Sequence, residues 1–69
     1  MCTEHFRVME AQGDLEDWQE AKRLLLPWVD AARVVGHHEL LVAMDESLER
    51  VEQEIERARE ELEEARAAL

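Results

Sequence analysis

The sequence contains few of the residues that form disulfides, turns or aromatic clusters. Its 69 residues include one cysteine, one proline, two glycines and no tyrosine. The single cysteine, Cys2, cannot form an internal disulfide, and the chain shows no secretory signal pattern, so we expect a cytoplasmic location. The longest apolar runs, residues 24–29 and 40–44, are far shorter than the ~18–20 residues of a membrane span, so we expect no membrane association.

Basic residues are also scarce. Eight Lys and Arg stand against 18 Asp and Glu, for a net charge of −10. Such a chain lacks the basic surface that holds phosphate backbones, which disfavours direct nucleic-acid binding. It is also too short for a multidomain enzyme, and its core is marginal for an isolated chain.

The residues that are abundant favour helix. The chain is rich in Ala, Leu, Glu and Arg, and 46% of it is hydrophobic, which predicts an all-α fold and argues against intrinsic disorder. Residues 1–12 are expected to form an N-terminal arm or short helix. Gly13-Asp14 has the residue types of a helix end followed by a helix start, so the next helix is predicted at about 15–35, with an N-terminal boundary at residue 14. Pro27 predicts a kink or break within it.

Residues 15–35 carry two apolar stripes at helical spacing, as expected for a helix that touches two neighbours. The first consists of Leu15, Trp18, Leu25, Val29 and Ala32, interrupted by Lys22, and the second of Ala21, Leu24, Trp28, Ala31 and Val35. A short turn, Gly36-His37-His38, is then of the length that joins antiparallel helices. The fold is therefore predicted to be a helical hairpin.

The last segment has the most specific pattern. No Gly or Pro occurs in residues 39–69, and apolar residues recur at alternating steps of three and four, which predicts a long heptad helix at about 39–68. The heptad residues are Leu41, Met44, Leu48, Val51, Ile55, Ala58, Leu62, Ala65 and Leu69. We predict that they form an oligomer interface.

Helix length is the reason for expecting a partner. A helix over residues 39–69 rises about 46 Å, whereas a compact globule of this size is about 28 Å across. A helix over 15–35 reaches only to about Arg59, which leaves Leu62, Ala65 and Leu69 uncovered. Two hairpins are therefore expected to associate as a coiled-coil or four-helix bundle, with a homodimer favoured over a tetramer and the helix orientation open. The alternative is a monomer in which the N-terminal arm shields the tail.

Residues capable of chemistry are few. Cys2, His5, His37 and His38 are metal-ligand types, but adjacent histidines are poor co-ligands on one helix, so turn or helix-start roles are favoured. His38-Glu39 resembles the start of a zinc-protease motif, but Val42 stands where its second histidine is required. We expect no metal, no cofactor and no enzymatic activity.

Two functional hypotheses remain. The first is a self-associating interaction, adaptor or regulatory module that also binds a protein partner, with Trp18 and Trp28 as core residues or partner anchors. The second is an acidic inhibitor that imitates nucleic acid and binds a basic DNA- or RNA-binding protein. Its acidic surface would comprise Glu49, Glu56, Glu60, Glu63 and Glu64.

Overall fold

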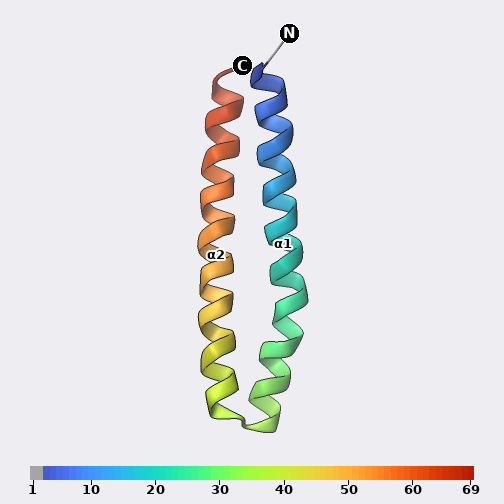
Figure 1. Cartoon of the computed structure of the whole chain (residues 1–69), viewed down its shortest axis with the longest axis vertical. Coiled ribbons are helices and arrows are strands. Elements are labelled where there is room, and N and C mark those ends of the chain that lie inside the picture. The colour runs from blue at the N-terminus through green and yellow to red at the C-terminus, as the bar shows by residue number, and fades with distance from the viewer. Residues whose placement is uncertain (1–2) are drawn as a thin grey trace.

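The protein is an antiparallel pair of long helices. The computed structural model describes residues 3–69 and contains α1 (Thr3–Val35) and α2 (His38–Ala67), which lie side by side over their whole length (Figure 1). The hairpin measures 54 × 14 × 11 Å. The predicted all-α helical hairpin is confirmed.

The turn matches the prediction to within one residue. Gly36 has a φ of +77°, a conformation that glycine adopts without the steric cost of a side chain. The N–H groups of Gly36 and His37 both donate to the Ala32 carbonyl, at 3.0 and 3.2 Å, and so close the end of α1. His37 then caps α2, because its Nδ1 accepts a hydrogen bond from the Leu40 N–H at 3.1 Å.

The beginning of α1 differs from the prediction. The helix starts at Thr3 and runs through Gly13 and Asp14, so the expected boundary there, and the separate arm over residues 1–12, are wrong for the described residues. A glycine inside a helix costs about 1 kcal/mol relative to alanine. Ala11 is buried and Leu15 half-buried against α2 on either side of Gly13, and this packing outweighs the local preference for a helix end.

Pro27 does not break α1 either. The helix is continuous through it, although proline cannot donate to the carbonyl of Arg23. Both residues lie on an exposed side of the helix, where water can satisfy that carbonyl, while Leu25 and Val29 still face α2. The predicted break is therefore absent, while the kink that was its alternative stays a prediction.

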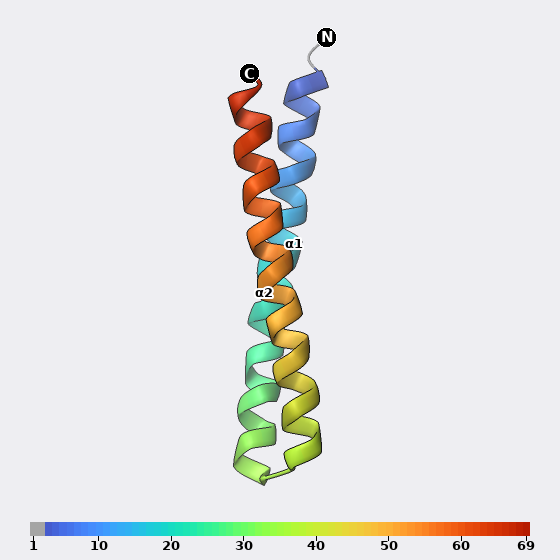
Figure 2. The ribbon, with the colours of Figure 1, turned by 90° about the vertical axis from the view of Figure 1, so that its left-hand side faces the viewer.

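A heptad seam on each helix forms the core. In α1 the inward positions follow one another at alternating steps of four and three, and every one is buried or half-buried: Val8, Ala11, Leu15, Trp18, Lys22, Leu25, Val29 and Ala32. In α2 the inward positions are the predicted heptad residues from Leu41 to Ala65, which are also buried or half-buried. Figure 2 shows the two helices crossing along their length, as heptad-packed helices do.

The turn sets which residues lie opposite each other. Positions equally far from the Gly36–His37 pair face one another, so large side chains meet small ones near the open end of the hairpin. The facing pairs of this kind are Val8 with Ala65, Ala11 with Leu62, and Leu15 with Ala58, whereas the next pair, Trp18 with Ile55, joins two large side chains. This alternation explains why Ala65, Ala58 and Leu62 retain only 0%, 5% and 7% of their exposure.

The tail of α2 is therefore covered by its own chain. Leu62 and Ala65 were expected to be uncovered, and this expectation is wrong because residues 3–14 extend α1 alongside them. Leu69 follows the end of α2 and is 64% exposed. The N-terminal part of the chain thus shields the tail of α2, as the monomeric alternative expected.

Neither α1 nor α2 contains a stretch with the length and apolarity needed to cross a bilayer.

Candidate interaction surface

The heptad residues of α2 pack within the hairpin. From Leu41 to Ala65 they face α1 of the same chain and are buried or half-buried, which leaves little of their surface for the oligomer interface predicted there. Only Leu69 is exposed. A surface for another molecule must therefore be sought among the apolar side chains outside the seam.

The second stripe of α1 provides such a surface. Leu24, Trp28 and Val35 are 59%, 64% and 77% exposed, and Ala31 between them is also exposed. Trp18, by contrast, is half-buried in the seam. The two tryptophans therefore have different environments, because Trp28 is exposed outside the seam whereas Trp18 packs within it.

This stripe runs the length of α1 and changes half-way from apolar to acidic residues. From Val35 back to Ala21 it is apolar, and it continues toward the N-terminus at the same spacing through Asp17, Asp14 and Glu10. On α2, the line of residues beside the seam also changes from apolar residues near the turn to charged residues near the open end. It consists of Leu40, Ala43, Ser47, Arg50, Glu54, Arg57, Glu61 and Glu64.

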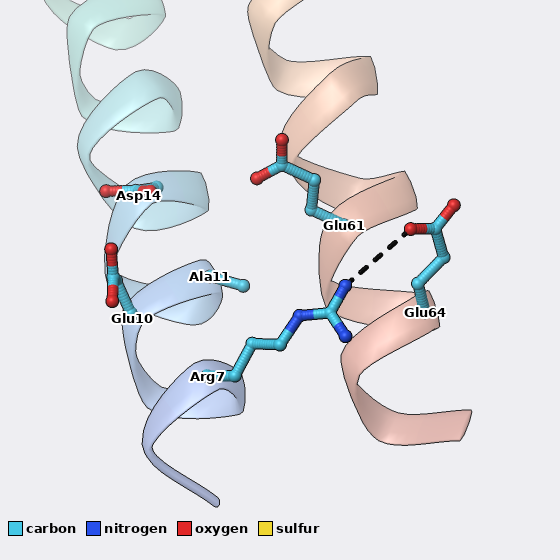
Figure 3. Close-up of a pocket in the computed structure, with 6 residues that line it drawn as sticks. All are labelled: Arg7, Glu10, Ala11, Asp14, Glu61 and Glu64. Atoms are coloured by element: carbon cyan, nitrogen blue, oxygen red, sulfur yellow. Dashed lines mark ion pairs between the residues drawn. The ribbon is translucent and has the colours of Figure 1, made fainter. Parts of the chain in front are cut away.

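Two shallow grooves show that these lines share one face of the hairpin. One groove, of about 340 Å³, is lined by Glu10 and Asp14 of α1 and by Glu61 and Glu64 of α2, with Ala11 at its floor (Figure 3). A neighbouring groove is lined by Asp14 together with Trp18, Glu54, Arg57, Ala58 and Glu61. Since both lines keep heptad spacing along wound helices, they stay on this side down to the turn. We call this side the striped face.

The striped face has an acidic half and an apolar half. In the acidic half, near the open end, Arg7 reaches across from α1 to Glu64 at 3.8 Å, as Figure 3 shows. The other carboxylates that line this groove outnumber its cationic side chains. In the apolar half, near the turn, heptad spacing places exposed apolar side chains of both helices on the same face, as far as the level of Leu24, where Arg50 of α2 begins the charged part. We call these residues the turn-side patch: Leu24, Trp28, Ala31 and Val35 of α1, and Leu40 and Ala43 of α2.

The opposite face is polar in its middle. There Lys22 extends from the seam to Glu52 at 3.8 Å, so its apolar stem covers the core while its amine lies outside. Gln19, Glu56 and Arg59 line the same side. The further exposed apolar residues, Phe6, Met9, Leu26, Val34, Val42 and Leu69, do not continue the stripe.

One surface ion pair perturbs a titration. Arg23 Nε donates to Glu20 Oε2 at 2.9 Å, and a second guanidinium nitrogen contacts the other carboxylate oxygen. These hydrogen bonds, together with the Arg23 charge, hold the pKa of Glu20 below its ordinary value and raise the pKa of Arg23. Both side chains are exposed, so the pair adds little to stability.

The candidate metal-ligand residues have other positions. His37 caps α2 and His38 is its first residue, so the predicted turn and helix-start roles are confirmed for this pair. Cys2 lies outside the described residues, and His5 is exposed on α1. Within residues 3–69, no three His, Cys, Asp or Glu side chains converge as a metal site would require.

No protein family matches the sequence, and no curated protein or solved structure shows significant similarity to it. The surface of the hairpin is therefore the guide to function.

Proposed function

We propose that this chain is a non-enzymatic interaction module that self-associates through the turn-side patch. The observation that carries the proposal is the 64% exposure of Trp28 at the centre of an apolar stripe. Contiguous apolar patches of this kind on small proteins mark binding surfaces. Tryptophan is also the residue type most enriched at the centres of protein interfaces.

The size of the patch suggests the strength of association. From their exposed fractions, Trp28, Leu24, Val35 and Leu40 together present roughly 450 Å² of apolar surface. Two such patches would bury about 900 Å², which is below the standard size of a stable interface. We therefore expect a homodimer with a Kd of about 1–100 µM. The hairpin would then be a subunit whose remaining surface is free for a protein partner.

The test is size-exclusion chromatography with in-line light scattering over a series of concentrations. The wild-type mass should rise from 8.1 kDa toward twice that value. Trp28→Glu should keep the mass at 8.1 kDa, because it places a charge in the centre of the patch. Phe6→Glu is the matched control, since Phe6 is an equally exposed aromatic residue (67%) on the same helix outside the patch.

A wild-type mass of 8.1 kDa at every concentration up to about 1 mM would refute self-association. Equal effects of Trp28→Glu and Phe6→Glu would refute the role of the patch.

Nucleic-acid imitation remains the second candidate, supported by the exposure of all five glutamates proposed for it. Glu60, Glu63 and Glu64 lie together near the end of α2, although Glu64 is engaged by Arg7. The chain would then displace duplex DNA from a basic DNA-binding protein, and the Glu60→Gln/Glu63→Gln variant would do so less well. Displacement that is unchanged in this variant would refute the idea.

A further inference from the structure

We propose that the partner on the turn-side patch is a second copy of this chain, docked antiparallel and staggered so that only the turn halves of the two hairpins overlap. This inference rests on the proposed function and adds the geometry of the same site. The twofold axis would lie in the interface, perpendicular to the helices, and would bring α1 onto the partner's α1 and α2 onto the partner's α2.

The α1 stripe is self-complementary when it is reversed. Leu24, Trp28, Ala31 and Val35 are spaced by four, three and four residues, so the spacing reads the same in both directions. An axis midway between residues 29 and 30 places Trp28 against the partner's Ala31 and Leu24 against the partner's Val35. Each tryptophan thus meets the smallest side chain of the stripe, which is how packed interfaces accommodate large rings.

On α2 the same axis falls beside small side chains. The midpoint of the α1 stripe lies seven residues before the centre of the turn, and the point seven residues after it lies between residues 43 and 44. There Ala43 lies next to the axis, and Leu40 faces the partner's Ser47. The Ser47 hydroxyl already donates to the Ala43 carbonyl at 3.0 Å, so its burial leaves no donor unsatisfied. These small residues allow the two α2 helices to approach closely.

The charges of the striped face disfavour a parallel dimer. In a parallel dimer, the acidic halves of the striped faces would be superposed, with Glu10 and Asp14 against the partner's Glu61 and Glu64. In the staggered dimer these carboxylates lie beyond the partner's turn. Like charges in contact disfavour an interface, so the distribution of charge along the face disfavours the parallel dimer, and the staggered dimer avoids this repulsion.

This arrangement has a measurable shape. The overlap extends about seven residues on each side of the axis, or roughly 21 Å at 1.5 Å per residue. Two hairpins of 54 Å would therefore form a particle about 85–90 Å long, with an acidic arm at each end. A parallel, fully overlapped dimer would remain close to 54 Å.

Single-cysteine crosslinking tests the axis directly, in a Cys2→Ser background. Ala43→Cys places a thiol beside the axis, where two copies approach within the ~4–7 Å Cα separation that a disulfide requires. Glu61→Cys is the matched control, because it lies on the same line of α2 in the acidic half. Under air oxidation, at a concentration where light scattering finds a dimer, Ala43→Cys should form disulfide-linked dimers at least about tenfold faster than Glu61→Cys.

Each outcome supports or contradicts the proposal. Fast Ala43→Cys crosslinking, together with a maximum dimension of about 85–90 Å in small-angle X-ray scattering of the wild type, would support it. A dimer in which Glu61→Cys crosslinks as fast as Ala43→Cys, or whose length stays near 54 Å, would overturn the arrangement and leave self-association standing. A wild-type chain that stays monomeric would overturn both.

Discussion

Leu62 provides the most direct test of how the hairpin is held together. It keeps only 7% of its exposure and lies opposite Ala11, in the part of α1 that extends past Gly13. Leu69 is the next leucine of the same heptad but is 64% exposed. If the seam is closed by residues 3–14 of the same chain, Leu62→Ala and Leu69→Ala must differ strongly in stability.

The expected difference follows from the packing. Leu→Ala removes three carbons, which is about 2.4 kcal/mol at ~0.8 kcal/mol per buried methylene. A cavity adds to this cost, but the seam of a two-helix hairpin is open at its edges, so water and side-chain movement reduce the added cost. We expect Leu62→Ala to lower the free energy of unfolding by about 2–3 kcal/mol. Leu69→Ala should change it by less than about 0.5 kcal/mol.

The measurement is urea denaturation followed by circular dichroism, with all proteins at one concentration so that self-association contributes equally. Leu62→Ala should shift the midpoint to much lower urea, while Leu69→Ala should overlay the wild type. If the two variants lose the same stability, the N-terminal part of α1 does not cover the tail of α2, and the fold described above is refuted.

Other predictions concern the two glycines, the cap of α2 and one ion pair. Gly13→Ala should raise the free energy of unfolding by about 0.5–1 kcal/mol, because the added methyl meets no atom within 4 Å and the helix gains propensity; a loss in thermal denaturation would instead show a helix end there. Gly36→Ala should lower it by about 1 kcal/mol in the same assay, since φ is +77°, and an unchanged stability would contradict the left-handed turn. His37→Ala should cost about 0.5–1 kcal/mol through loss of the cap, and His37→Asp should restore it; equal stability of the two variants would contradict the capping role. Arg23→Gln should raise the pKa of Glu20 toward its ordinary value in an NMR titration. Because the native pKa of Glu20 is lowered, the small contribution of the pair to stability is present at neutral pH and is lost as the pH falls through that pKa. An unchanged titration of Glu20 would show that the pair does not form in solution.

The exposed stripe was visible in the sequence, but its role was not. Leu24, Trp28, Ala31 and Val35 stand at helical spacing, which predicted a helix with two neighbours. The hairpin supplies one neighbour, α2, on the side of Leu25 and Val29. Periodicity alone could not tell which of the two stripes α2 would cover, because both have similar apolar content.

The seam in residues 3–12 was missed although its signal is present. Val8 and Ala11 precede Leu15 by seven and four residues and continue its heptad. Gly13-Asp14 obscured this continuity, because its residue types favour a helix end. The seam could have been found by extending the heptad through the glycine instead of stopping at it.

Propensity, spacing and the backbone freedom of Gly36 were enough to predict from the sequence a helix on each side of the turn, the turn itself and the heptad face of α2. The start of α1 at Thr3 and its cover over the tail of α2 depend instead on tertiary packing. That outcome depends on burying Ala11, Leu62 and Ala65 together, a gain between segments far apart in the chain that exceeds the local cost of Gly13. Local preferences act over a few residues, whereas the seam sums its packing over the whole length of both helices.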